Sequence, residues 1–367
     1  MHEPLQLGCV VACPVLVSDF DFDLPEDLIA QEAAPRGRSR LLVFDRETGA
    51  IEHRHVAELA THLRDGDLLV VNDTRVFAAR LLGHRVPSGG VVECLLLSLP
   101  EAAAGEAVEC DALMHPGQKL KAGATVRFAG DAGGLVAEVL EQRFFGRRRI
   151  RLRPEDRHAR VDLLVDALGH MPLPPYIKRP DLPADRDRYQ TIFASQRGSV
   201  AAPTAGLHFT PEMLDDLAAR GVERTAVTLH VGYGTFKPVR AEHVEEHIVD
   251  PEPYEISDAA ASAINAARQQ RRRVIAVGTT TTRALEDAAI RGAGTVPAGA
   301  AFATLFIHPG FEFKVIDGLM TNFHLPRSSL LMLVAAFAGR DRVLAAYASA
   351  VREQYRFYSY GDAMLIL

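Results

Sequence analysis

The sequence predicts an α/β main domain with a largely parallel sheet, plus an inserted small all-β barrel domain. Apolar runs alternate with helical patterns at both ends of the chain, which is typical of parallel sheets. Between residues 80 and 153, short apolar runs alternate with Gly- and Pro-containing turns and show no helical pattern, which is typical of an antiparallel barrel. We assign residues 77–154 to the barrel, residues 17–76 and 155–367 to the α/β domain, and residues 1–16 to an extension outside both.

One strand near the N-terminus is expected to be buried on both faces of the sheet. Residues 24–29 predict a short helix headed by Pro, residues 40–45 a strand, and residues 56–63 an amphipathic helix. Residues 67–72 then form an apolar run typical of a strand buried on both faces. It ends in Asn72-Asp-Thr-Arg75, four polar residues at the carboxyl end of a strand, where α/β sheets bind ligands.

The rest of the chain continues both patterns. Barrel strands are predicted at residues 91–97, 107–114, 125–128, 135–140 and 149–152. Thr210 followed by Pro211 predicts one helix N-terminus in the α/β domain, and Ser257 predicts another. The elements predicted there are helices at 161–168, 257–270 and 341–354, strands at 222–231 and 273–278, a helix opened by residues 279–283, and a terminal apolar strand.

Composition excludes several classes of protein. Hydrophobic residues make up 48% of the 367 positions and charged residues 24%, a balance typical of a soluble globular protein. No apolar run approaches the roughly 18–20 residues of a membrane helix. The net charge of −6 argues weakly against a nucleic-acid partner, so any RNA contact must be local. Residues 5–17 lack the features of a signal peptide, and the cysteines form no C-x-x-C pair, so we expect a cytoplasmic protein with reduced thiols.

Two loops rich in Gly, Thr and His predict a small-molecule pocket. Glycine lets the backbone approach a ligand closely, and Thr and His supply hydrogen bonds. Each loop abuts an apolar run, and a packed core does not need such a cluster. The residues concerned are Thr204, Gly206 and His208 in the first loop, and His230, Gly232 and Gly234 in the second.

Two further loops extend this prediction. A buried strand ends just before Thr279, Thr280 and Arg283, whose helix N-terminus suits a carboxylate, a ribose hydroxyl or a phosphate. A plain N-cap by threonine explains the same residues equally well. Asn322 and His324 lie between apolar runs. A lone histidine there is more often a satisfied core residue, but three histidine-bearing loops in one domain favour a site.

Two short motifs are weighed and set aside. His243-Val-Glu-Glu-His247 matches the H-x-x-E-H zinc-protease pattern, with Glu246 as general base. No third ligand stands at a recognisable spacing, and a polar helix facing solvent or substrate is the favoured interpretation. Gly232-Tyr-Gly234 follows a strand but opens no helix, so it is not a dinucleotide-binding fingerprint. We therefore expect no metal site.

Two arginine clusters are candidates for RNA contact. A solvated strand edge and a solvated helix end explain them equally well. They are Arg147, Arg148, Arg149, Arg151 and Arg153 in the inserted domain, and Arg271, Arg272 and Arg273 in the α/β domain.

Eight segments resemble, in order, the S-adenosylmethionine:tRNA ribosyltransferase-isomerase family of queuosine biosynthesis. They are residues 66–76, 172–177, 187–191, 201–209, 228–236, 274–280, 321–326 and 355–364. The chain departs from the family pattern at Asp250, where a His is usual, and at His115, where Lys or Arg is usual. Thr281 and Thr282 replace a typical Ser-Val pair. The change at Asp250 argues further against a metal role for the H-x-x-E-H motif.

The resemblance implies ribosyl transfer from S-adenosylmethionine. In this family the ribosyl portion moves to the amine of 7-aminomethyl-7-deazaguanine at the tRNA wobble position, giving epoxyqueuosine-tRNA, while adenine and methionine leave. The expected partners are this tRNA and S-adenosylmethionine, a consumed co-substrate, with no other cofactor, no metal and no membrane; we expect a monomer. A general base must remove a proton from the 5′ carbon, adenine departs best when protonated, and the attacking amine must be neutral.

The resemblance also suggests roles. Histidine is the natural acid or base near neutral pH, so we expect His208 and His230 nearest the proton transfers, with His324 the third candidate. Asp73, counted with the catalytic residues, and Arg75 are expected to order the ribose or the amine. Thr279, Thr280 and Arg283 are expected to hold the methionine carboxylate. Further expected contacts to S-adenosylmethionine are Asn72, Thr204, Gly206, Gly232, Gly234 and Asn322.

RNA binding is expected through phosphates and a splayed anticodon base. Arg188 and Tyr189 join the two arginine clusters as candidates, and Tyr189 or Phe236 is expected to stack on a base. Three rival functions remain open. A zinc peptidase predicts stoichiometric zinc, and a non-catalytic RNA-binding module predicts tRNA binding that survives changes in residues 204–208. A conventional methyltransferase needs a glycine loop between strand and helix, which we do not find.

Overall fold

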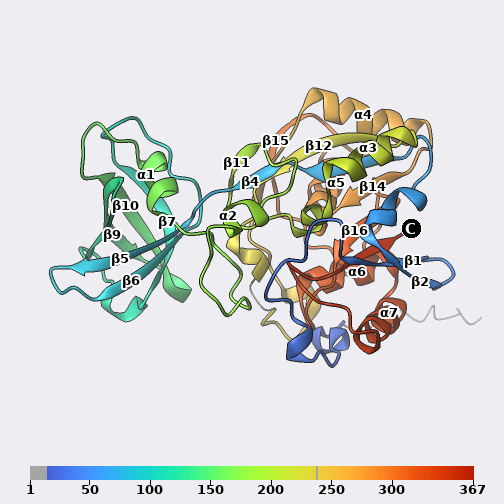
Figure 1. Ribbon diagram of the computed structural model, residues 1–367, viewed down its shortest axis with the longest axis horizontal. Helices are drawn as coiled ribbons and strands as arrows, with labels where there is room; N and C mark the ends of the chain where they lie inside the picture. The colour runs from blue at the N-terminus through green and yellow to red at the C-terminus, as the bar shows by residue number, and fades with distance from the viewer. Residues whose placement is uncertain (1–14, 237–238) are drawn as a thin grey trace, which may run out of the picture.

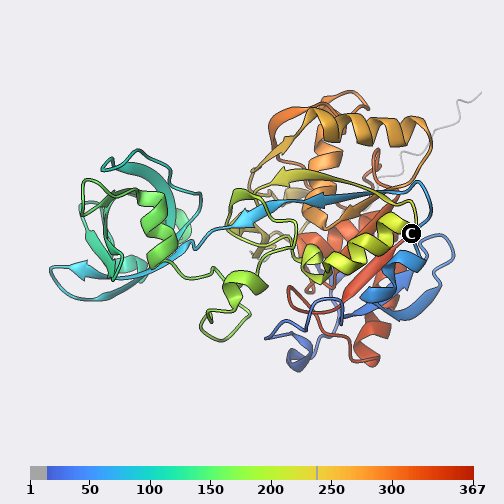
Figure 2. The same cartoon turned by 45° about the horizontal axis from the view of Figure 1, so that its top comes forward.

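The computed structural model describes residues 15–236 and 239–367 and contains two bodies joined by a narrow connection (Figure 1). A β barrel lies on one side and a larger sheet-and-helix body on the other, as the turned view also shows (Figure 2). Most of the N-terminal extension, including Cys9 and Cys13, lies outside the described residues. Among the described residues, no helix has the length and apolar character needed to cross a membrane.

The larger body is built on a nine-stranded sheet. Its fourth strand, β3, is buried at every residue, as the apolar run at residues 67–72 predicts. In spatial order the strands are β15 (Gly299–Ala303), β13 (Glu252–Ile256), β12 (Glu223–Leu229), β3 (Leu68–Asn72), β14 (Val274–Val277), β16 (Gly318–Asn322), β17 (Ala363–Ile366), β1 (Arg40–Phe44) and β2 (Ile51–His55).

The sheet is mixed, so the prediction of a largely parallel sheet is wrong. β12, β3, β14 and β16 run parallel in the middle, and β17 is parallel to β1. The other four pairings, β15–β13, β13–β12, β16–β17 and β1–β2, are antiparallel. Strands β2 and β13 carry exposed charged residues or Pro253, and β15 is mostly Gly and Ala. Such segments lack the apolar signature of a buried parallel strand.

Helices cover both faces of the sheet. α5 packs its Ala284 and Leu285 with Leu319 of β16 on one face, whereas α3 packs its Met213 and Leu217 against the opposite face. Thr210 caps α3 and Ser257 caps α4 through their hydroxyls, as predicted. The first face carries α4 (Asp258–Gln269), α5 (Thr279–Arg291), α6 (Ser329–Ala338) and α7 (Arg340–Arg352), and the second carries α3 (Pro211–Ala219) with the 3-10 helices η3 (Val56–Thr61) and η6 (Thr204–His208).

The inserted barrel is confirmed. Its six strands form a closed, fully antiparallel ring, and α1 (Val161–Leu168) packs Leu164 and Val165 into its core. A short parallel ribbon of β4 (Thr74–Val76) and β11 (Gln196–Ser199) lies where the two bodies meet (Figure 1). In spatial order the barrel strands are β10 (Arg147–Pro154), β7 (Val108–His115), β6 (Val91–Leu96), β5 (Arg80–Val86), β8 (Thr125–Gly130) and β9 (Gly133–Gln142).

The remaining elements are short. They are α2 (Asp185–Arg188) and the 3-10 helices η1 (Val17–Phe20), η2 (Glu26–Leu28), η4 (Gly117–Lys119), η5 (Phe144–Gly146), η7 (Tyr233–Phe236) and η8 (Val244–Glu246).

Candidate active site

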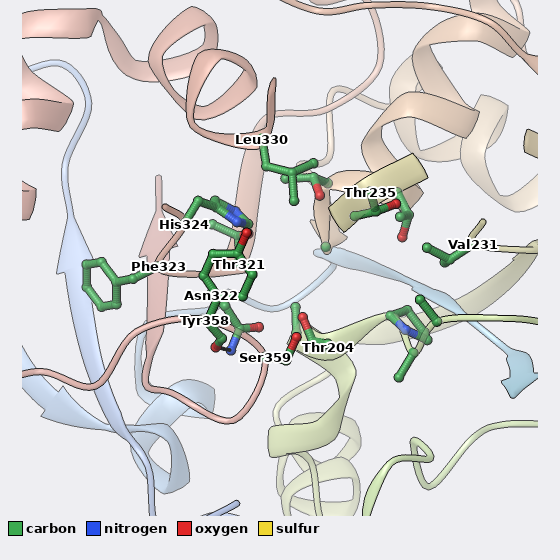
Figure 3. Close-up of a pocket in the computed structure, with 17 residues that line it drawn as sticks. Thr204, Val231, Thr235, Thr321, Asn322, Phe323, His324, Leu330, Tyr358 and Ser359 are labelled. Atoms are coloured by element: carbon green, nitrogen blue, oxygen red, sulfur yellow. Dashed lines mark hydrogen bonds between the residues drawn. The ribbon is translucent and has the colours of Figure 1, made fainter. Parts of the chain in front are cut away.

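A pocket opens at the carboxyl ends of the central parallel strands (Figure 3). It encloses about 540 Å³, including open solvent at its mouth. Its walls come from four of the segments singled out in the sequence: residues 201–205, 278–280, 321–324 and 358–359. Val231, Thr235 and Leu330 complete the lining.

The N-terminus of α5 forms one wall of the pocket. Gly278 turns the chain from β14 into α5 with φ of 93°, a conformation that favours glycine. The hydroxyls of Thr281 and Thr282 bond back to backbone carbonyls, at 2.7 and 3.2 Å. The hydroxyl of Thr280, by contrast, is buried and has no partner among the described residues. Free helix amides beside an unpaired hydroxyl suit an anionic ligand group.

Asn322 and His208 meet at the opposite side of the pocket. Asn322 ends β16, and its Nδ2 lies 3.2 Å from Nε2 of His208 and 3.1 Å from the carbonyl of Tyr358. Its Oδ1 is buried without a partner in the described structure. Burial lowers the pKa of His208 to about 4, so the imidazole is neutral at physiological pH.

His324 is the histidine that lines the pocket itself. Its Nε2 lies 2.8 Å from the hydroxyl of Thr321, and its backbone amide donates to the Tyr347 hydroxyl at 3.1 Å. Burial lowers the pKa of His324 to about 3. It is therefore a neutral hydrogen-bonding group near pH 7.

His230 belongs to a second polar cluster, at the ends of β3 and β12. Its Nδ1 lies 2.7 Å from the hydroxyl of Thr74. Asp73 accepts hydrogen bonds from Thr228 at 2.6 Å and from Ser195 at 2.9 Å. Burial lowers the pKa of the half-buried His230, and the charges of Asp73 and Glu255 oppose that effect. The cluster adjoins the pocket through Val231 and the interdomain ribbon through Thr74.

Arg283 faces away from the pocket, unlike its expected role. Its guanidinium forms a buried ion pair with Glu252 and donates to the carbonyls of Leu305 at 3.1 Å and Ala303 at 3.2 Å. Glu252 in turn accepts from the amide of Gly232 at 2.9 Å. Arg283 is thus occupied by protein groups and anchors the loop that carries Thr235.

Several other predicted contact residues have structural partners. The amide of Asn72 bonds only to backbone groups of Leu229 and Thr74. A side chain at Gly206 would meet Thr191 and Phe193 within 3 Å, so packing requires glycine there. Gly234 is similarly packed against Asp250. Thr204 lines the pocket as expected, and Arg75 is exposed on β4 with no ion pair among the described residues.

The arginine run of the barrel is matched by acidic partners. Arg148 is buried and donates to the carbonyls of Leu120 and Gly117 at 2.8 and 2.6 Å. Arg149 and Arg151 lie across from acidic side chains of neighbouring strands, and Arg147 pairs with Asp250. The pairings are Arg149 with Glu109 and Asp111, Arg151 with Glu109 and Glu138, and Arg147 with Asp250.

The other RNA candidates are scattered. Tyr189 is fully buried, with its ring edge-on to Tyr360, and Arg188 donates to the carbonyl of Ala34. Arg271 and Arg272 precede β14, so they lie at the amino ends of the parallel strands, whereas the pocket lies at the carboxyl ends. Arg272 bonds there to Gly66 and Glu223. The side chain of Phe236 lies outside the described part of the chain.

The prediction of a polar helix at the H-x-x-E-H motif is wrong. Only the 3-10 turn Val244–Glu246 forms there, its Val244 is buried, and His243 and His247 flank it in extended conformation. Helical spacing, on which the zinc interpretation depends, is therefore absent. Within the described residues, no group of three His, Cys, Asp or Glu side chains is arranged to hold a metal ion.

Sequence reasoning missed four residues of these two clusters. Thr74 and Thr321 each bond a histidine, Glu252 holds the 232–235 turn, and Tyr358 accepts from Asn322. Thr74 and Thr321 adjoin predicted residues at strand ends, which is a usable signal. Tyr358 lies in the segment 355–364 that prompted the family resemblance, whereas nothing local marks Glu252.

A family model described as queuosine biosynthesis protein matches residues 17–366. The chain belongs to the queuosine biosynthesis protein family. As a member of this family it is an enzyme, a transferase. The S-adenosylmethionine:tRNA ribosyltransferase-isomerase of Heliobacterium modesticaldum is 50% identical over 96% of this chain and 99% of its own. That of Moorella thermoacetica is 49% identical over the same shares.

A solved structure supports the family fold. The crystal structure of the S-adenosylmethionine tRNA ribosyltransferase from Thermotoga maritima is 38% identical, with a TM-score of 0.52. The match covers 95% of this chain and all of that one. The match therefore spans both the barrel and the mixed sheet. The 38% identity agrees with membership of the same family.

Proposed function

We propose that this protein transfers and isomerises the ribosyl moiety of S-adenosylmethionine onto 7-aminomethyl-7-deazaguanine at the wobble position of tRNA. The product is epoxyqueuosine-tRNA, and adenine and methionine are released. S-adenosylmethionine is a consumed co-substrate, and the proposed chemistry calls for no metal. The observation that carries the proposal is the pocket at the strand ends, whose walls come from the segments that resemble this family.

The methionine end of S-adenosylmethionine is proposed to lie at the N-terminus of α5. The free amides of Thr279 and Thr280 and the unpaired Thr280 hydroxyl suit its carboxylate. This keeps two of the three expected carboxylate ligands. It leaves out Arg283, because the guanidinium of Arg283 is already bonded to Glu252 and two carbonyls.

The proton transfers are proposed to involve His230 and His324. His324 lines the pocket and is neutral, so it is placed to interact with the reacting ribosyl portion. His230 is half exposed and lies near Asp73. It therefore has the environment of a general base near neutral pH. We assign to His230 the removal of a proton from the amine of 7-aminomethyl-7-deazaguanine. This amine must be neutral before it attacks. His208 does not line the pocket, and its Nε2 is bonded to Asn322, so it is not our first candidate for proton transfer.

The tRNA is proposed to approach along the β4–β11 ribbon. Arg75 is exposed there, next to Asp73, and has no ion pair within the described structure. The barrel arginines, in contrast, are matched by acids. Arg75 is therefore our leading candidate for a phosphate contact.

The experiment that tests the function is release of free adenine from S-adenosylmethionine, followed by chromatography. We expect release only when an anticodon stem-loop carrying 7-aminomethyl-7-deazaguanine is present. The matched control is the same stem-loop with guanine, which lacks the attacking amine. Equal adenine release with both stem-loops would contradict the proposed acceptor, and formation of S-adenosylhomocysteine would indicate methyl transfer instead.

A further inference from the structure

The orientation of the Asn322 amide is fixed by its neighbours. The backbone carbonyl of Tyr358 can only accept a hydrogen bond, so the Asn322 atom 3.1 Å from it must be the nitrogen. The second hydrogen of that nitrogen points to Nε2 of His208 at 3.2 Å. Nε2 must therefore accept, which places the proton of the neutral imidazole on Nδ1. Burial lowers the pKa of His208 to about 4, so the ring is neutral near pH 7 and carries a single proton.

Both N–H groups of Asn322 are thus used, and its oxygen is left as an acceptor. Asn322 is 2% exposed, and Oδ1 has no partner among the described residues. In Figure 3 its side chain points towards Thr204 and Ser359 across the pocket. An unsatisfied buried acceptor destabilises the protein, and a hydrogen-bond donor on a ligand would remove that cost. Tyr358, with φ of 75°, holds its carbonyl through a backbone conformation that is uncommon outside glycine.

The position of Asn322 shows which half of S-adenosylmethionine it would meet. Side chains alternate along β16, so Thr321 and Asn322 point to opposite faces of the sheet. Leu319 packs with α5, on the face of Thr321, whereas Met320 packs with η6, on the face of Asn322. The ammonium and carboxylate of methionine share one carbon atom and both stay near α5. The donor that reaches Asn322 must then come from the nucleoside half.

We propose that Oδ1 of Asn322 accepts a hydrogen bond from the nucleoside half of S-adenosylmethionine, from the adenine 6-amino group or a ribose hydroxyl. His208 is a positioning residue that acts through Asn322. This inference rests on the proposed function, because it takes S-adenosylmethionine as the occupant of the pocket. It gives the pocket a selective end, where only a donor is accepted.

The tautomer of His208 tests the first step without any loss of folding. Long-range ¹H–¹⁵N spectra of the full-length, ¹⁵N-labelled protein, with His208→Gln used for assignment, report which ring nitrogen carries the proton. We expect the proton on Nδ1 of His208 between pH 6 and 8. A proton on Nε2 would mean that the amide is turned round with its oxygen on His208, and the proposal would be overturned.

Binding of analogues tests the contact itself. Dissociation constants are measured calorimetrically for S-adenosylmethionine and for its 2′-deoxy, 3′-deoxy and 6-deamino analogues, with wild type and Asn322→Leu. We expect one analogue to bind wild type roughly tenfold or more weakly, and Asn322→Leu to bind that analogue and S-adenosylmethionine equally. The matched control is Asn265→Leu, since Asn265 of α4 bonds to the backbone of Val296, and neither residue lines the pocket. It should discriminate like wild type.

A conservative variant separates positioning from proton transfer. His208→Gln offers an amide oxygen to Asn322 but no acid or base, so we expect it to keep the analogue discrimination that His208→Leu loses. The proposal is overturned if discrimination persists in Asn322→Leu, or if wild type binds all three analogues as tightly as S-adenosylmethionine. Failure of wild type to bind S-adenosylmethionine at all would contradict the proposed function as well, whereas tight binding without coupling to Asn322 contradicts only this inference.

Discussion

Arg283 of α5 and Glu252 of β13 form a buried ion pair directly behind the turn that carries Thr235. Glu252 accepts from the amide of Gly232 and the hydroxyl of Thr235, at 2.9 and 3.4 Å. Because α5 also supplies Thr279 and Thr280, the pair holds two walls of the pocket in a fixed relationship. Its contribution is to the shape of the site rather than to contact with a ligand.

The first prediction concerns this pair. Arg283→Met leaves Glu252 buried and uncompensated, so we expect the free energy of unfolding to fall by roughly 3–5 kcal/mol. Urea denaturation measures it. The control on the same helix is Arg291→Met, which breaks a pair that is half exposed on the Arg291 side and should cost less. Equal losses in the two variants would contradict a structural role for Arg283.

The second prediction is the pH dependence of turnover. Burial lowers the pKa of His230 below its ordinary value, and a general base works only above its pKa. The rate should therefore fall as the pH drops through that pKa, and His230→Gln should be slow and lack this acid limb. Asp73→Asn removes a charge that raises the pKa, so its acid limb should move to lower pH. An unchanged acid limb in His230→Gln would exclude His230 as the base.

The third prediction is acid instability. The pKa values of His208 and His324 are lowered to about 4 and about 3 in the folded protein. In the unfolded chain the two histidines take up protons near pH 6.5. Their contribution to the free energy of unfolding is therefore fully present above that pH and is lost as the pH falls towards 4. The loss from His208 alone is roughly 3 kcal/mol. His208→Gln should flatten the dependence of the urea midpoint on pH, whereas the exposed His158→Gln should not. Parallel curves for all three proteins would contradict it.

The fourth prediction concerns tRNA binding. Arg75→Ala should weaken binding of the anticodon stem-loop and reduce the slope of log affinity against log salt by about 1. Arg151→Ala is the matched control, because Arg151 already pairs with Glu109 and Glu138. Filter binding at several salt concentrations measures both. A larger effect of Arg151→Ala than of Arg75→Ala would contradict this prediction and would indicate that the barrel arginines bind the RNA.

The parallel strands in the middle of the sheet were predictable from the sequence, whereas the antiparallel strands beside them were not. β3 consists of apolar residues up to Asn72, and Thr210 with Pro211 marks the start of α3, so local chemistry decides both. β13 contains Glu252 and Pro253, which argue against a buried strand. Glu252 is tolerated there because Arg283, 31 residues away, neutralises it. No local pattern reveals such a partner, and the missed antiparallel strands follow from this.

The candidate site was predictable as a set of loops rather than as a set of roles. Thr280 and His324 follow buried strands and Asn322 ends one, and parallel strands bring their carboxyl ends together. The direction of each side chain depends on tertiary contacts. His208 and Asn322 pair across 114 residues, and the Arg148 guanidinium turns inward to carbonyls of its own barrel. Residue type alone suggested a catalyst and an RNA contact at these two positions.

The central claim is that the ribosyl carbons, and not the methyl group, leave S-adenosylmethionine for the tRNA. The most direct measurement uses S-adenosylmethionine with ¹³C in the ribose and deuterium in the methyl group, followed by mass spectrometry of the anticodon stem-loop carrying 7-aminomethyl-7-deazaguanine. The account predicts that all five ribose ¹³C atoms appear in the RNA and that the deuterium appears in free methionine. Deuterium in the RNA, with the ribose label retained in S-adenosylhomocysteine, would contradict it.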